Sequence, residues 1–255
     1  MTIEVTLTAP LPAAIECGAQ SKLQWVNDAL TGPGFKLLNS TIQSRRFGVL
    51  CMGRDGEITG NRFENNPGPS ILLINDDDYD NPAESRMGYM PRDILISGNS
   101  FVNCSRCVPD PYHAGTAPSL LAVIGSAVVG PSTPPFGSTP EPFRRVSYHG
   151  VQNITITGNS ITNWYRGVAV LLGEVHGVAV TSNTISEPPR MPSGGARRGG
   201  AEAAVVVADS DTVVVAKNIF AGGWSSVSGA HGGAVQVASH STRNINVTKN
   251  QVRPP

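Results

Sequence analysis

Short alternations of apolar and polar residues recur along the chain, and each ends in an asparagine followed by another apolar residue. Ile154 and Ile156, for example, alternate with polar residues before Asn159. Residues two apart in a strand point to one face, so the alternating residues of every copy are expected to face a common interior. The six copies are Gly56–Phe63, Asp93–Phe101, Asn153–Ile161, Val178–Ile185, Val213–Phe220 and Ile245–Val252. Such repetition is typical of a solenoid.

The asparagine of each copy stands where the chain has to bend. Asn tolerates a left-handed backbone, and its amide can bond to neighbouring peptide groups. Stacked coils would place the asparagines above one another in a ladder that satisfies their side-chain amides. The ladder predicted in this way comprises Asn61, Asn99, Asn159, Asn183, Asn218 and Asn250.

A second set of apolar runs lies between these copies. The runs are Phe47–Cys51, Ser70–Ile74, Leu120–Ile124, Gly167–Leu172, Ala203–Val207 and Gly233–Val237. One strand of each kind per coil predicts an all-β chain folded as a right-handed parallel β-helix of about six coils, a single domain over residues 1–255. An antiparallel β-sandwich would instead show a series of tight hairpin turns such as Asn-Gly, and the chain has none.

The spacing of the asparagines predicts where loops are inserted. Successive intervals are 38, 60, 24, 35 and 32 residues, whereas a bare coil needs little more than roughly 20. The surplus is expected in two inserts, Val108–His149 and Glu187–Gly200. Loops inserted into solenoids tend to gather on a functional face.

Composition and charge narrow the classes of function. Lys+Arg and Asp+Glu both total 19, which gives no electrostatic case for nucleic acid or an anionic membrane. No apolar run is long enough to span a bilayer. The first residues do not read as a signal peptide, so the chain either stays inside the cell or lacks the true N-terminus of a longer protein. The four cysteines lack the spacing of a zinc site, and neither a metal nor a cofactor is predicted. Homo-oligomers are compatible with the open ends of a solenoid.

Carboxylates gather where one predicted strand ends. Asp76, Asp77, Asp78 and Asp80 follow the run Ser70–Ile74, and Asp55 lies one strand pair earlier. If the strands are stacked, these acids emerge at nearby edges. Glycoside hydrolysis needs one carboxylic acid and one carboxylate, and crowding raises the pKa of one member of such a set. A solvated loop or a calcium site would explain the same acids.

Residues 10–105 resemble the β-helix of the family 110 glycoside hydrolases, which are inverting, exo-acting α-1,3-galactosidases. The resemblance is carried by Gly34–Ile42, Arg45–Leu50, Ile58–Phe63, Ser70–Asp77, Glu84-Ser85 and Asp93–Phe101, and it covers the C-terminal half of those enzymes. The pattern departs from the family in several places, among them Gly18-Ala19 where a Gly-Asp is expected and one extra residue within Asp76–Asp80. The family's Arg-x-Arg-Gly is Arg45–Gly48 here, with the second Arg lost, and Pro82-Ala83 replaces an aromatic pair.

This resemblance implies a site and a substrate. Its catalytic residues would be Asp55, Asp76 and Asp77, and its sugar-binding residues would be Arg45, Arg46, Asp78 and Glu84. The implied function is hydrolysis of terminal α-galactosides with inversion, without a cofactor, outside the cell or in the periplasm. Two alternatives stay open. One is a polysaccharide lyase whose Asp cluster holds calcium, and the other is a structural or sugar-binding β-helix without catalysis.

Overall fold

The computed structural model describes residues 34–43, 48–51, 53–66, 68–74, 76–77, 86–87, 91–104, 119–124, 127–128, 145–146, 151–164, 168–186, 203–208, 210–224, 226–228, 233–238 and 242–254. For β7, β8, β11, β12 and β13 it describes the backbone alone. Within these ranges the chain is all-β, and they hold no helix that could cross a membrane.

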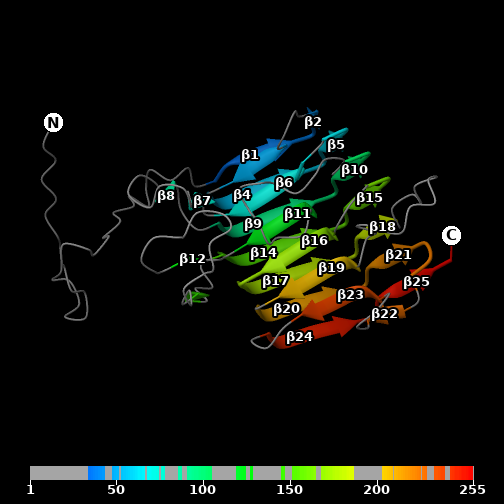
Figure 1. The fold of residues 1–255 in the computed structure, drawn as a ribbon. Coiled ribbons are helices and arrows are strands. Elements are labelled where there is room, and N and C mark those ends of the chain that lie inside the picture. The colour runs from blue at the N-terminus through cyan, green and yellow to red at the C-terminus, as the bar shows by residue number, and fades with distance from the viewer. Residues whose placement is uncertain are drawn as a thin grey trace, which may run out of the picture.

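Three seven-stranded parallel sheets make up the fold, and each is named here by a letter (Figure 1). Sheet A consists of β1 (Lys36–Leu38), β4 (Arg54–Thr59), β9 (Arg92–Ser97), β14 (Val151–Thr157), β17 (Val175–Thr181), β20 (Asp211–Ala216) and β24 (Arg243–Thr248). Sheet B consists of β2 (Thr41–Ile42), β5 (Arg62–Glu64), β10 (Ser100–Val102), β15 (Ser160–Thr162), β18 (Thr184–Ser186), β21 (Ile219–Ala221) and β25 (Gln251–Arg253). Sheet C consists of β3 (Val49–Cys51), β6 (Ile71–Ile74), β11 (Ser119–Ile124), β16 (Val168–Gly173), β19 (Ala203–Ala208), β23 (Gly233–Ala238) and β22 (Ser226–Ser228).

The chain passes through sheets A, B and C in turn and repeats the circuit, so each strand pairs with its counterparts one coil before and one coil after. The prediction of an all-β chain of parallel strands is confirmed, as are the two kinds of strand, which form sheets A and C. Sheet B is an addition, because its two- or three-residue strands carry a single inward residue each and so show no alternation. A seventh coil, starting at β1, precedes the six predicted copies.

The apolar interior is a set of columns that run from coil to coil. Ile58, Ile96, Ile156, Val180 and Val215 form one column of sheet A, and each is almost completely buried. In sheet B the rings of Phe63 and Phe101 stack with their centroids 4.8 Å apart. Gly56 takes the place of an aliphatic residue in the next sheet A column, because the ring of Phe35 from the preceding coil fills that space.

The predicted asparagine ladder forms at the corner between sheets A and B. The Oδ1 of Asn159 accepts the backbone N–H of Asn99 at 2.9 Å and its side-chain amide at 3.0 Å. The Asn159 amide donates in turn to Ile96 O and to Asn183 Oδ1. In the first coil Ser40 occupies the ladder position, and its N–H donates to Asn61 Oδ1 at 3.0 Å.

The two predicted inserts fall mostly outside the described residues. Residues 187–200 are not described at all. The range 108–149 contains β11, itself one of the predicted strands, together with β12 (Ala127–Val128) and β13 (Arg145–Val146), which pair antiparallel. A second antiparallel pair joins β7 (Asp76–Asp77) to β8 (Arg86–Met87).

Candidate active site

The candidate site lies at the edge where the strands of sheet C end and those of sheet A begin. Cys51 of β3 pairs with Leu73 of β6. Asp55 lies four residues after Cys51, and Asp77 lies four residues after Leu73. The backbone therefore brings both aspartates to this edge in adjacent coils. The chain also leaves the coils here between β6 and β9 and between β11 and β14, and the small pairs β7–β8 and β12–β13 are found at this end of the molecule (Figure 1).

Asp55 holds a special backbone position. Its φ is 51°, in the left-handed region that Asp, Asn and Gly tolerate better than other residues. The same position has a positive φ in the following coils, where it is occupied by Asp93, Asn153, Gly177, Thr212 and Asn244. The backbone alone therefore accounts for a residue such as Asp at position 55.

Two arginines stand beside exposed aspartates in successive coils at this edge. Arg54 Nε lies 3.7 Å from Asp55 Oδ2, and Arg92 Nε lies 3.9 Å from Asp93 Oδ2. Arg54 and Arg92 pair in register, so the two guanidinium groups come from neighbouring strands, which lie about 4.8 Å apart. The Asp55 side chain is 52% exposed, while that of Arg54 is 20% exposed. The side chains of Arg54 and Arg92 are therefore partly buried, and the carboxylates of Asp55 and Asp93 beside them are accessible.

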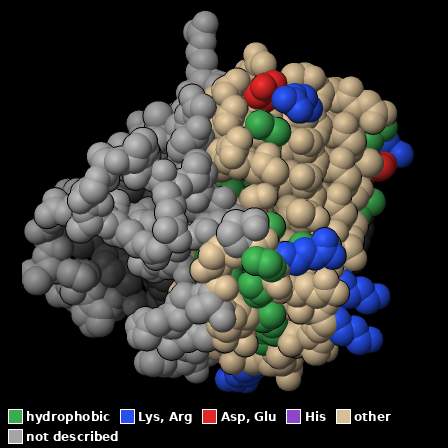
Figure 2. All heavy atoms as spheres, turned by 90° about the vertical axis from the view of Figure 1, so that its right-hand side faces the viewer, with side chains coloured by type: hydrophobic (Ala, Val, Ile, Leu, Met, Phe, Trp, Pro, Cys, Tyr) green, Lys and Arg blue, Asp and Glu red, His purple; other side chains and the backbone are tan. Residues whose placement is uncertain are grey.

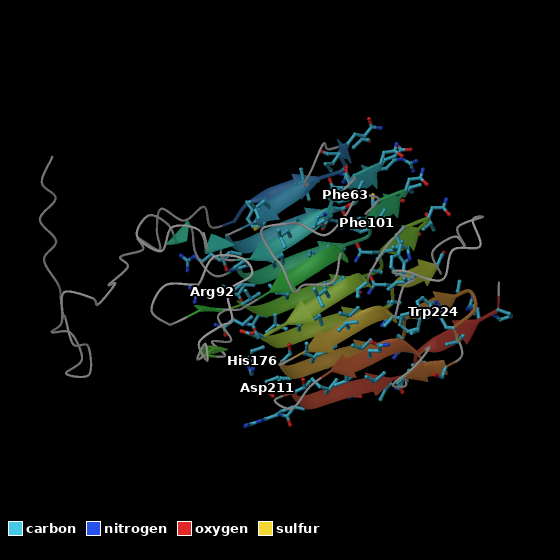
Figure 3. The ribbon with its side chains drawn as sticks, in the orientation of Figure 1. Phe63, Arg92, Phe101, His176, Asp211 and Trp224 are labelled. Atoms are coloured by element: carbon cyan, nitrogen blue, oxygen red, sulfur yellow. The ribbon has the colours of Figure 1, made fainter. Side chains whose placement is uncertain are left out.

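The row of polar side chains continues along the edge through Gln152 to His176 and Asp211. His176 Nδ1 lies 3.4 Å from Asp211 Oδ2 (Figure 3). Asn244 Nδ2 donates to Asp211 Oδ1 at 2.9 Å, and Thr212 Oγ1 donates to the same oxygen at 3.2 Å.

Asp211 is the aspartate of this row whose acidity is altered most clearly. Partial burial works to raise the pKa of its carboxyl group. The hydrogen bonds from Asn244 and Thr212 and the contact with His176 outweigh burial, and the pKa lies below its usual value. Asp211 is therefore ionised near neutral pH and contacts the imidazole at its Nδ1 edge.

The predicted site residues are described to different degrees. Asp55 lies in β4 at the edge between sheets C and A. Asp76 and Asp77 form β7, where they pair with Met87 and Arg86 of β8, and only their backbone is described. The remaining predicted residues, Arg45, Arg46, Asp78 and Glu84, lie outside the described residues.

Sequence reasoning missed Arg54, Arg92 and the pair of His176 with Asp211. A signal for the arginines was present, because Arg-Asp stands directly before the alternating strand in two consecutive copies, at Arg54-Asp55 and Arg92-Asp93. The signal for His176 and Asp211 is their place in the repeat, because each stands seven residues before the ladder asparagine of its copy, and β17 and β20 pair in that register.

No group of three or more His, Cys, Asp or Glu side chains suited to a metal occurs in the described part of the chain. Cys51 and Cys104 are free and buried in the core, and burial raises the pKa of the Cys51 thiol.

Comparison with known proteins gives little. No family model matches the chain, and no curated protein matches it. A solved structure from Parabacteroides merdae, described as a "putative glycosyl hydrolase", is similar with a TM-score of 0.34 and 10% identity. The match covers 79% of this chain and 80% of that one. A likeness this remote supports no inference about the activity of this chain, and the resemblance to family 110 remains a prediction.

Proposed function

We propose that this protein is a carbohydrate-active β-solenoid that hydrolyses terminal α-galactosides with inversion at the edge between sheets C and A. One observation carries the proposal: the pairing of β3 with β6 leads Asp55 and the Asp76-Asp77 strand to one edge in adjacent coils. We also propose that the coils are right-handed, because parallel strands joined by crossovers have that hand in about 98% of cases.

The proposed chemistry divides the carboxyl groups between two roles. Asp76 or Asp77 protonates the leaving oxygen, and Asp55 with the other aspartate positions and deprotonates the attacking water. Inversion requires the two carboxyl groups to be roughly 6.5–9.5 Å apart so that the water fits between them. Arg45, Arg46, Asp78 and Glu84 would bind sugar hydroxyls. Arg54 adds a cation beside Asp55 and holds that carboxylate at the edge.

Galactose release from a panel of α-galactosides tests this proposal. Asp55→Asn, Asp76→Asn and Asp77→Asn should each reduce kcat by at least about a hundredfold, because each removes a proton-transfer group. Asp93→Asn is the matched control, since Asp93 has the same left-handed backbone as Asp55 and likewise follows an arginine, Arg92. It should leave kcat within about twofold. Release that survives all three substitutions would place the catalytic acids elsewhere.

A non-catalytic, sugar-binding β-solenoid is the second candidate. It is favoured by the recurrence of Asp, Asn or Gly at the position of Asp55. The left-handed backbone alone then explains why an aspartate stands there, without a catalytic role. A folded chain that binds galactosides in calorimetry but releases no galactose would support this candidate. The same result would rule out the hydrolase for those substrates.

A further inference from the structure

The opposite end of the sheet A strands has an unusual pair of lysines. Each coil turns from sheet A to sheet B through one residue with a positive φ, and Lys217 and Lys249 hold this place with φ of 58° and 55°. The earlier coils use Asn39, Gly60, Gly98, Gly158 and Ser182. Lys217 N–H donates to Thr248 O at 3.2 Å, so the two lysines are neighbours in adjacent coils.

Turn geometry does not explain these lysines. A left-handed backbone suits Gly and Asn and is strained for a long side chain such as Lys. Both side chains are exposed, and neither ammonium group pairs with a carboxylate among the described residues. Two like charges one strand spacing apart, about 4.8 Å, also repel each other. Residues that are strained and mutually repulsive at a surface suggest that the charges themselves are used.

Positive charge is concentrated around them. Arg253, also exposed, projects from the sheet B strand of the last coil and donates to Gln251 Oε1. We call Lys217, Lys249 and Arg253 the basic corner. The described acid of these two coils, Asp211, lies at the other end of β20, about 20 Å from Lys217 along the strand. Figure 2 faces this side of the molecule, and its lower half shows Lys and Arg side chains with no Asp or Glu among them.

The first coils differ on the same side. There Lys36 Nζ lies 3.2 Å from Glu57 Oε2, and Arg62 Nε lies 3.2 Å from Glu64 Oε2. Cations are therefore neutralised at one end of the solenoid and left unneutralised at the other. Because the whole chain has a formal net charge of zero, the basic corner is a local feature rather than a consequence of a basic protein.

The surroundings of the basic corner indicate the kind of anion. Thr248 precedes Lys249, and Gln251 follows Asn250. The same two positions beside Lys217 are Ala216 and Ile219, and hydroxyl-bearing residues return in the two coils before that, at Thr157, Thr181, Ser160 and Thr184. Hydroxyl and amide groups suit a polyhydroxylated ligand. Binding of single-stranded nucleic acid usually relies on exposed aromatic rings, and no Phe, Tyr or Trp is exposed among the described residues.

We propose that the basic corner binds an acidic polysaccharide, whose carboxylate or sulfate groups contact Lys217, Lys249 and Arg253 while the sugar chain follows the stacking direction of the coils. This site lies at the far end of the sheet A strands from Asp55 and does not depend on the hydrolase proposal. It would hold the protein on a charged polymer whether or not the other edge is catalytic.

Binding of the full chain to polygalacturonate at low salt tests this site. Wild type should bind in calorimetry at about 50 mM NaCl and lose most of that affinity at about 0.5 M NaCl, because salt screens the attraction between the lysines and the anionic polymer. The double variant Lys217→Gly with Lys249→Gly should bind at least about tenfold more weakly. Its Tm should be unchanged or higher, because Gly already occupies this turn in three other coils.

The matched control removes the same two charges elsewhere. Lys36→Gln with Arg62→Gln lies in the paired, N-terminal coils and should keep affinity within about twofold. The proposal is overturned if wild type does not bind polygalacturonate at low salt, or if the glycine variant binds as well as wild type. It is also overturned if a single-stranded DNA oligomer binds as tightly as polygalacturonate, since the site would then recognise charge alone.

Discussion

The ladder asparagines are the residues on which the stacking of coils depends most directly. Each buried amide accepts two hydrogen bonds from one neighbouring coil and donates to a carbonyl in that coil and to the Asn of the other neighbouring coil, as Asn99, Asn159 and Asn183 show. Asn159 is 2% exposed. A buried polar group left without a partner costs more than the hydrogen bond itself contributes. The ladder therefore tolerates no apolar substitute in its middle.

Asn159→Ala tests this dependence. It leaves the N–H of Asn99 without an acceptor and leaves the Asn99 side-chain amide with Ile58 O alone, and we expect a loss of about 3 kcal/mol in the free energy of unfolding. Asn250→Ala, at the half-buried last ladder position, should cost only about 1 kcal/mol. Urea unfolding of both variants gives the comparison. Equal losses would mean that burial of the ladder does not determine its contribution.

Residue identity revealed the ladder but not the other left-handed positions. A buried Asn is required wherever its amide bonds two coils together, so the same residue recurs and is visible in the sequence. The position of Asp55 requires only a positive φ, which Asp, Asn, Gly and Thr supply in different coils. A position that requires a dihedral angle rather than a set of contacts accepts different residues in different coils. The sequence therefore shows the charge of Asp55 but not its backbone role.

At the scale of the strand, both the inward positions and the neighbours across coils can be predicted from the sequence. The alternation of Ile94 and Ile96 with polar residues predicts β9, and both side chains are buried in that strand. Arg54 and Arg92 each stand seven residues before the ladder asparagine of their copy, and so do His176 and Asp211. Aligning the copies on the ladder therefore gives the register in which these residues pair. The acids of β7 were predicted because they cluster in sequence, whereas the residues of the edge row are dispersed over five strands and stand out only when the copies are aligned.

The left-handed position near the start of each sheet A strand shapes the strand itself. In β17 it is Gly177, with a φ of 65°. A Cβ added there would lie 2.9 Å from Asn153 Oδ1 and would also strain the backbone. Asn153 and Asn244 hold the same place in other coils, which shows that an Asn side chain fits the position.

Gly177→Ala should therefore destabilise the protein by about 1–2 kcal/mol, and Gly177→Asn by clearly less. Gly173→Ala is the matched control, because a Cβ at Gly173 meets nothing within 4 Å and its φ is not positive. It should change the free energy of unfolding by at most about 0.5 kcal/mol in either direction. Thermal and urea unfolding of the three variants decide the matter. If Gly177→Ala proved as mild as Gly173→Ala, the strand would accommodate a different backbone at this position.

For the whole molecule, contacts between neighbouring coils dominate, so stability should vary along the stack. The middle strand β14 alternates between buried and accessible residues, whereas every residue of β24 in the last described coil is exposed or half-buried. Sheet C differs at this end, because β22 pairs with the outer side of β23 and covers its edge. The edges of β24 and β25 have no such cover among the described strands.

Amide hydrogen exchange should reveal this gradient through one hydrogen bond that recurs in each coil. Ser160 N–H donates to Asn99 O and Gln251 N–H donates to Asn218 O, both at 2.9 Å, so bond length does not distinguish them. We expect the Gln251 amide to exchange at least about a hundredfold faster than that of Ser160, because the last coil can open without disturbing the rest. Equal protection of the two amides would indicate that all the coils open together as one cooperative unit. A rate intermediate between them for the equivalent amide of Ile219, one coil further in, would show that opening proceeds coil by coil from this end.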